Sequence, residues 1–254
     1  MKEFIKYNTT SFPDALVREA EGLGLLTDAL REAGETGPGA LRVPEVLRVS
    51  DGELALPRIE TAPATSAGMA AFGAGLARMH SQSMPHYGLN IDNMIGLSRQ
   101  KNTLMDDWGA FYVDYRLRTQ LAMIKDERVR KEFEARLDAC DAALRGFLNE
   151  HCDHPSLLHG DLWAGNALFD GSSPWLIDPA VYYGDREADL AMTELFGGFS
   201  SAFYRAYDSV YPRTSVYELK RPIYNLYHTL NHYNLFGASY LGACRRNLEA
   251  LHQL

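Results

Sequence analysis

Two carboxylates and one carboxamide lie in a short stretch where their types and spacing could support phosphoryl transfer. Asp161 and Asn166 are five residues apart in the run HGDLWAGN (159–166), and Asp178 follows twelve residues later, after a second apolar strand. Phosphoryl transfer needs a carboxylate near the attacking hydroxyl, ligands for magnesium and cations on the phosphates. Asp161 fits the first role, and the side-chain oxygens of Asn166 and Asp178 fit the second.

Each part of this pattern also has a structural interpretation. Gly-Asp is a common turn, and an Asp-Pro pair often follows an apolar strand. Together, however, the two parts specify residue types, a spacing and a strand–loop–strand context. Chance rarely produces that combination, so we interpret it as a catalytic site.

The run HGDLWAGN resembles the catalytic loop of aminoglycoside phosphotransferases, choline kinases and fructosamine kinases. With Trp163 in it, the run is most similar to the fructosamine (ketosamine) kinase family. IDPAVYYGDREADLAMTELFGGF (177–199) resembles the same family. Further similar segments are YGLNIDNMIG (87–96), DDWGAFYVDYRLRTQL (106–121) and LNHYNLFG (230–237). The resemblance covers nearly the whole chain from Lys6 onward. It implies an α+β, protein-kinase-like fold with two lobes, and an ATP-dependent small-molecule kinase that needs Mg²⁺.

The resemblance also implies a role for each residue of the loop. Asp161 would accept or orient the proton of the substrate hydroxyl, and Asn166 and Asp178 would hold Mg²⁺ against the ATP phosphates. Trp163 would stack on the sugar or on its amine-derived substituent, although a Trp that anchors the loop in the core is the alternative. We expect His159 to orient the loop. The acidic residues Asp185, Glu187 and Asp189 are expected to cap a helix that begins near Ala188.

Near the start of the chain, Lys6 matches the lysine that contacts ATP in kinase-like enzymes. Glu19 matches its ion-pair partner on the following helix, with Glu21 as the competing candidate. Such a pair neutralises phosphate charge and holds the lysine in place. The strand at 54–59, with Pro57 and Ile59, takes the position of the hinge whose backbone binds adenine.

The family places two strands and a Gly-rich phosphate loop before this lysine, but only five residues precede Lys6 here. We therefore expect a truncated N-terminal lobe (1–62) that lacks this loop, followed by a C-terminal lobe (63–254). Without the loop we expect poor ATP binding and slow or absent turnover. The strand at 4–7 would become an exposed edge, either disordered or paired with another copy in a homodimer.

The pattern of apolar residues predicts the elements that position these side chains. It predicts a strand at 2–8, a helix from Ser11 through Leu26, and two strands at 44–49 and 53–59 joined by a turn at Asp51-Gly52. From residue 63 the chain becomes helical, and the most regular amphipathic helix covers 128–150. Short strands are predicted at 157–158, 167–169 and 175–177, and the rest, 190–254, reads as helical and aromatic.

Composition excludes several other classes of function. The chain of 254 residues is 46% apolar and 23% charged, with a formal charge of −8. That acidic balance argues against nucleic acid or an acidic membrane surface as a partner. The three cysteines are widely spaced and no apolar run is long enough to span a bilayer. We therefore expect reduced thiols and a cytoplasmic protein.

The acceptor is the open question. A ketosamine, a sugar bearing an amine substituent, is favoured by the resemblance alone. An aminoglycoside would need an acidic cleft and choline an aromatic cage, and a non-catalytic kinase-like binding protein is a third hypothesis. We expect the acceptor cleft between Trp163 and an aromatic region whose other members are mostly core. These are Trp108, Tyr182, Tyr183, Tyr227, His232 and Tyr233.

Overall fold

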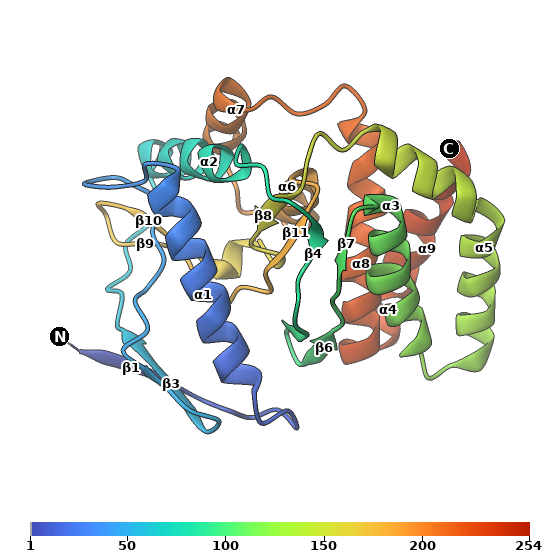
Figure 1. Cartoon of the computed structure of the whole chain (residues 1–254), viewed down its shortest axis with the longest axis horizontal. Helices are drawn as coiled ribbons and strands as arrows, with labels where there is room; N and C mark the ends of the chain where they lie inside the picture. The colour runs from blue at the N-terminus through green and yellow to red at the C-terminus, as the bar shows by residue number, and fades with distance from the viewer. Residues whose placement is uncertain (1) are drawn as a thin grey trace.

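The computed structural model describes residues 2–254. Its N-terminal part is a three-stranded antiparallel sheet with one long helix (Figure 1). β1 (Glu3–Tyr7) pairs along its whole length with β3 (Glu53–Pro57), and β2 (Arg48–Val49) pairs with the other side of β3. Helix α1 (Ala15–Glu32) follows β1 in the chain. This is the strand, helix, strand, strand order that the sequence predicts.

Helix α1 joins this sheet to the rest of the protein. Leu16 and Leu23 pack with Leu54 and Leu56 of β3 in a small separate cluster, whereas Leu26 and Leu30 belong to the main core. The helix runs six residues past the predicted end at Leu26 because its apolar spacing continues to Leu30. One helix therefore fixes the position of the small sheet relative to the remainder.

Strand β1 forms one edge of this sheet, with Phe4 52% and Tyr7 64% exposed. The exposed edge that the sequence predicts is therefore present in the described residues, and the strand is formed, so the disordered alternative is wrong. Pairing between copies stays a prediction. The predicted strand at 44–49 shrinks to β2, because only its last two residues, Arg48 and Val49, pair with β3 as a strand.

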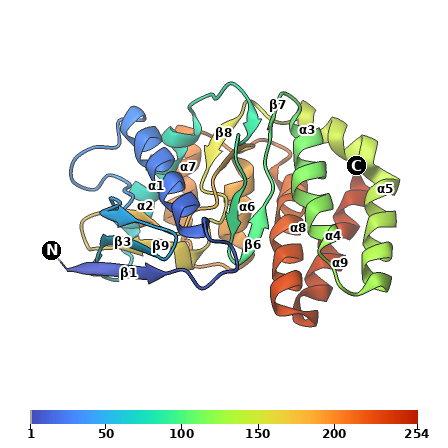
Figure 2. The same ribbon diagram turned by 60° about the horizontal axis from the view of Figure 1, so that its bottom comes forward.

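The C-terminal part is mostly helical, as predicted. Helices α2 (Ser66–His80) and α5 (Glu127–Glu150) match the two clearest apolar periodicities. In Figures 1 and 2, α3, α4, α5, α8 and α9 gather at the end of the molecule farthest from β1. The other helices are α3 (Trp108–Phe111), a π-helical segment (Tyr112–Arg118), α4 (Thr119–Ala122), α6 (Glu187–Leu195), α7 (Ser201–Val210), α8 (Tyr217–Phe236) and α9 (Leu241–Ala250).

Short strands lie between the two parts. β9 (Ala167–Phe169) and β10 (Pro174–Leu176) correspond to the strands predicted at 167–169 and 175–177, and they pair as an antiparallel hairpin. A four-stranded sheet has the order β7-β4-β11-β8, and β5 pairs with β6. The sequence predicts only β8 of these, from the apolar pair Leu157-Leu158. Their bounds are β4 (Tyr87–Gly88), β5 (Asn93–Ile95), β6 (Ser98–Gln100), β7 (Leu104–Met105), β8 (Ser156–Leu158) and β11 (Tyr182–Gly184).

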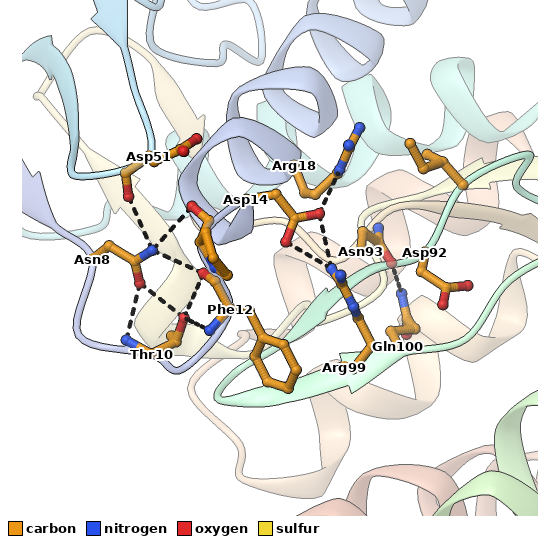
Figure 3. Close-up of polar contacts among 12 residues, drawn as sticks. Asn8, Thr10, Phe12, Asp14, Arg18, Asp51, Asp92, Asn93, Arg99 and Gln100 are labelled. Atoms are coloured by element: carbon orange, nitrogen blue, oxygen red, sulfur yellow. Dashed lines mark hydrogen bonds and ion pairs between the residues drawn. The ribbon is translucent and has the colours of Figure 1, made fainter.

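The hairpin of β5 and β6 fastens α1 to the C-terminal part (Figure 3). Arg99 on β6 donates from one nitrogen to both carboxylate oxygens of Asp14, each at 3.1 Å, and its guanidinium lies over the ring of Phe12. Asp14 also accepts a hydrogen bond from Arg18, so the first turn of α1 is held from both sides. This ion pair fixes the end of α1 nearest to Glu19.

The turn before α1 is closed by Asn8, also shown in Figure 3. Its amide nitrogen donates to the carbonyls of Phe12 and Asp51 at 2.9 and 3.0 Å, and its amide oxygen accepts from the backbone of Thr10 at 2.9 Å. β1, α1 and the β2–β3 turn therefore share one hydrogen-bonding side chain.

Among residues 2–254, no helix combines the length and apolar character needed to cross a membrane.

Candidate active site

The loop after β8 carries Asp161, and the glycine that precedes Asp161 has a conformation and surroundings that favour glycine strongly. Gly160 has a φ of +81°, and a Cβ placed there would lie 2.0 Å from the carbonyl oxygen of Ala180. Only glycine combines that conformation with so close an approach of two backbones. The Gly-Asp turn of the HGD motif thus lets the loop pack directly against the segment after Asp178.

Asp189 of helix α6 anchors the same loop. Its carboxylate accepts the backbone N–H of His159 at 2.7 Å and of Gly160 at 2.9 Å. The Nε2 atom of the buried His80 ring lies 3.3 Å from it. Burial alone would raise the pKa of Asp189, but these hydrogen bonds keep its pKa below the usual range. A buried, hydrogen-bonded carboxylate therefore sets the backbone of the catalytic loop.

His159 orients the loop, as predicted. Its Nε2 atom lies 2.9 Å from the carbonyl oxygen of Ile177, and its Nδ1 atom accepts the backbone N–H of Asp161 at 3.3 Å. The ring is buried, which lowers the pKa of His159. A buried neutral imidazole bonded on both sides ties the two strands of the site together.

Asp161, Asn166 and Asp178 meet in one place. The amide nitrogen of Asn166 donates to the backbone oxygen of Asp161 at 2.8 Å and lies 3.3 Å from its carboxylate and 3.4 Å from the carbonyl oxygen of Asp178. A pocket of about 220 Å³ opens beside them. Its lining includes Lys6, Glu19, Asp161, Trp163, Asn166 and Asp178.

The two acids of this pocket differ in environment. Burial raises the pKa of Asp161 to about 7; the hydrogen bond from Asn166 opposes that shift, and the charge of Asp178 adds to it. Asp178 is the only residue other than glycine with a positive φ, +52°, in the described part of the chain. Pro179 follows it and further restricts its backbone. Such conformations cost about 1–3 kcal/mol and concentrate at functional sites.

Lys6 crosses from the small sheet to this pocket. Its ammonium lies 2.7 Å from Glu19 and 3.2 Å from the carboxylate of Asp178. Burial raises the pKa of Glu19 to about 6, although the charge of Lys6 works against that shift. Glu21 instead pairs with Arg18 at 2.8 Å. The structure thus selects Glu19 over Glu21 as the partner of Lys6.

The predicted hinge borders a second, more apolar pocket of about 390 Å³. Pro57 and Ile59 line it together with Leu168 and Ile177 from the C-terminal part, and Asp178 belongs to both pockets. Pro57 and Ile59 also border a larger hollow on the α1 side of the hinge. This more apolar pocket therefore adjoins the Lys6 pocket at Asp178.

The donor set of the pocket suits magnesium. Within residues 2–254, no three His, Cys, Asp or Glu side chains form a group able to hold a metal by themselves. Mg²⁺ is commonly bound by one or two carboxylates with phosphate oxygens of the substrate completing its shell. Asp178 and the amide oxygen of Asn166 offer such a partial set of hard oxygen ligands.

The whole chain matches a known family. The model of the family described as "Fructosamine kinase" matches residues 1–253. The chain belongs to the fructosamine kinase family. A relative from Vibrio parahaemolyticus, named a probable ketoamine kinase, is 37% identical over 94% of this chain and 81% of its own length. This membership identifies the chain as a phosphotransferase with a hydroxyl acceptor, and a kinase implies ATP as the donor.

Solved structures agree with this family. A crystal structure from Thermobifida fusca, provisionally named a fructosamine-3-kinase, has a TM-score of 0.84 and 30% identity over 99% of this chain and 86% of that one. An aminoglycoside phosphotransferase with ADP bound has a TM-score of 0.60 and 14% identity, covering 98% of this chain and 86% of the other. The second similarity concerns the fold alone and confirms the protein-kinase-like architecture.

Trp163 of this fructosamine kinase family member lies at the mouth of the site, not in the core. It is 40% exposed, and its ring meets Phe196 edge-on with centroids 6.3 Å apart. The ring also covers Gly165, where a Cβ would come within 2.3 Å of it. The alternative of a Trp that anchors the loop from the core is therefore wrong.

Half of the aromatic residues that the sequence groups with Trp163 are fully buried core, in line with the expectation that most of them are core. Trp108, Tyr182 and Tyr227 are each 1% exposed. They pack around the guanidinium of Arg116 or against one another. These rings fill the space between α8 and the four-stranded sheet, where they stabilise the lobe. Tyr183, His232 and Tyr233 are only partly buried.

The acidic residues Asp185, Glu187 and Asp189 stabilise the structure, the first two at the start of α6 and the third at the catalytic loop. Asp185 accepts the backbone N–H of Glu187 at the start of α6, as predicted for a cap, and both acids pair with the buried Lys220 at 2.7 and 2.9 Å. Asp189 does not cap the helix, because its hydrogen bonds go to the catalytic loop. The sequence could not reveal this, since the partners lie about 30 residues away in the chain.

Proposed function

We propose that this chain transfers the γ-phosphoryl group of ATP to a sugar hydroxyl of a ketosamine. One observation carries the proposal: Asp161, Asn166 and Asp178 converge on a pocket that Lys6 enters from the other lobe. Family membership supports the reaction class. The names ketoamine kinase and fructosamine-3-kinase, given to relatives that share most of this chain, support the acceptor class.

In this proposal the two pockets that share Asp178 divide the nucleotide between them. The adenine occupies the apolar pocket at Pro57 and Ile59, and the phosphates extend past Asp178 toward Lys6. Lys6 then exchanges its contact with Asp178 for phosphate oxygens, while Glu19 keeps it in place. Asn166 and Asp178 would hold Mg²⁺, which neutralises phosphate charge during transfer.

Asp161 acts on the acceptor. Its carboxylate accepts or orients the proton of the attacking hydroxyl, and the bond from Asn166 to its backbone oxygen fixes its position. Trp163 lines the same pocket and provides an indole surface for the sugar or its amine. The pocket excludes much of the surrounding water from Asp161, as its raised pKa reflects.

The acidic and buried aromatic residues that the sequence suggests for the two alternative acceptors are not available to them. An aminoglycoside needs an accessible acidic cleft, but Asp185, Glu187 and Asp189 are buried and paired. Choline needs an open aromatic cage, but Trp108 and Tyr224 lie in the core, where they bond to each other. A non-catalytic binding protein would not need Asp161, Asn166 and Asp178 to line one pocket together.

The test is direct observation of the product. The purified chain, ATP and Mg²⁺ are incubated with fructosyl- or ribulosyl-butylamine, with kanamycin and with choline, and products are followed by ³¹P NMR. We expect one sugar phosphate per ADP with the ketosamines only. Asp161→Asn should reduce kcat by about 10²- to 10⁴-fold. Phosphorylation of kanamycin or choline in preference to the ketosamines would overturn the proposal.

We also propose that the protein works in the cytoplasm, in agreement with its free cysteines Cys140, Cys152 and Cys244. A homodimer through the exposed edge of β1 belongs to the same proposal, since Phe4 and Tyr7 present apolar surface there. Light scattering on wild type and on a Phe4→Lys variant would test it: a dimeric mass that the substitution halves is expected, and a monomeric wild type contradicts it.

A further inference from the structure

A row of aromatic rings leads outward from the catalytic pocket. Trp163, which lines that pocket, contacts Phe196 with ring centroids 6.3 Å apart. Phe196 contacts His232 at 5.0 Å, and His232 contacts Phe236 at 5.5 Å and Tyr240 at 5.0 Å. We call these five residues the aromatic row. They come from the catalytic loop, the end of α6, the last turns of α8 and the turn after it.

The local structure brings these elements together. Helices α6 and α8 lie side by side in Figures 1 and 2, so their ends present Phe196 and His232 to each other. Gly237 ends α8 with a φ of +84°, which turns the chain so that Tyr240 packs back on His232 and Phe236. The row is therefore built by the fold and not by neighbours in one helix.

Three of the five rings in the row are exposed, which is unusual for adjoining aromatic side chains. Trp163, Phe196 and Phe236 are 40%, 44% and 61% exposed. They are three of the five most exposed large aromatic side chains in the described residues; the other two, Phe4 and Tyr7, lie on β1. Scattered apolar residues on a surface need no explanation, but adjoining ones commonly mark a binding site.

We infer that the aromatic row binds the amine substituent of the acceptor, and that this substituent is an apolar or aromatic group. The inference rests on the proposed function. A ketosamine has a sugar, a secondary amine and a substituent on that amine. With the sugar at Asp161, the pocket of about 220 Å³ must also admit the transferred phosphoryl group. The substituent must then leave the pocket, and Trp163 at its mouth leads to the row.

The chemistry of the row fits such a group. The face of an indole ring attracts a protonated amine, and the rings beyond it offer apolar surface whose burial favours hydrocarbon. No Asp, Glu, Lys or Arg side chain belongs to the row. A larger apolar substituent therefore gains contact with Phe196 and Phe236, whereas a methyl group ends near Trp163.

The test compares acceptors that differ only in the substituent. We measure kcat/KM for fructosyl adducts of methylamine, butylamine and benzylamine with wild type, Phe196→Ala, Phe236→Ala and Val210→Ala. Val210 is an exposed apolar residue at the end of α7, outside the row. In wild type and Val210→Ala we expect kcat/KM to rise about tenfold or more from methylamine to benzylamine. In the two Phe variants the rise should fall to about twofold, with the methylamine adduct and the KM for ATP unchanged.

Two results would overturn the inference: a flat profile in wild type, or a full rise in both Phe variants. Light scattering on the same proteins tests a competing occupant, because a second copy of the chain could cover the row. A Phe236→Ala variant that changes the solution mass as well as the profile would also overturn it. Loss of activity on every ketosamine would instead contradict the proposed function, so the two failures are distinguishable.

Discussion

At the level of single residues, Asp161 combines burial with negative charge, and the two conflict. Its pKa of about 7 in the folded protein exceeds the ordinary value of 3.8. Between those values the folded state therefore binds more protons than the unfolded state, and this group lowers stability as pH rises through 7. The partial burial that raises the pKa of this carboxylate therefore makes the free protein less stable at high pH.

This conflict predicts an effect on stability that is separate from activity. Without metal or nucleotide, Asp161→Asn should raise the free energy of unfolding at pH 8 by about 1–3 kcal/mol relative to wild type, and change it far less at pH 4. Urea unfolding at both pH values measures this. Asp51→Asn removes an exposed carboxylate and is the control. A difference from wild type that is equal at pH 4 and pH 8 would contradict the assignment.

The partner of Lys6 gives a second prediction for single residues. Glu19→Gln removes the charge 2.7 Å from Lys6, whereas Glu21→Gln, two residues along the same helix, removes a charge that faces Arg18. We expect Glu19→Gln to raise the KM for ATP about tenfold, the equivalent of about 1.4 kcal/mol. Glu21→Gln should leave the KM near wild type. Steady-state kinetics with varied ATP decide between them, and equal effects would contradict the assignment of Glu19.

At the level of elements, the sequence predicts helices better than strands. Helices α2 and α5 have long amphipathic patterns and appear where predicted. Strands β4 to β7 have two or three residues each and are not predicted from the sequence. They form because long-range contacts stabilise them, such as the bonds from Gln100 and Asn93 to the carbonyls of Ala180 and Val181.

The anchoring of the catalytic loop by α6 gives the prediction at this level. The carboxylate of Asp189 accepts the backbone N–H groups of His159 and Gly160, one on each oxygen. In Asp189→Asn one of these oxygens becomes an NH₂ group, which donates and cannot accept. We expect a loss of about 2 kcal/mol in the free energy of unfolding, since a buried donor is left unpaired. The value of kcat should fall with little change in the KM for ATP.

Chemical denaturation and kinetics on the same preparation measure both effects. Asp208→Asn removes a carboxylate from a partly exposed pair with Arg213 and should cost under about 1 kcal/mol. If Asp189→Asn and Asp208→Asn behave alike, α6 does not hold the loop in the way described.

At the level of the whole molecule, the site lies where the two lobes meet, with Lys6 from the N-terminal part beside Asp178 from the C-terminal part. The motif alone predicts Asp161, Asn166 and Asp178, because their spacing is local to one loop and the next strand. The choice of Glu19 over Glu21 needs the orientation of α1 against β1, which only the packed structure provides. The same holds for the surroundings of Trp163. Of the aromatic residues that the sequence groups with it, only His232 belongs to the aromatic row, and the packed structure adds Phe196, Phe236 and Tyr240.

The most direct measurement of this site is metal binding with nucleotide present. Mn²⁺ replaces Mg²⁺ as a paramagnetic probe, and its binding to the chain with a non-hydrolysable ATP analogue is titrated by electron paramagnetic resonance. We predict nucleotide-dependent binding of Mn²⁺ to wild type and to Asp51→Ala, and a loss of affinity of at least about tenfold in both Asn166→Ala and Asp178→Ala. Equal Mn²⁺ affinity in all four proteins would contradict a metal site at Asn166 and Asp178.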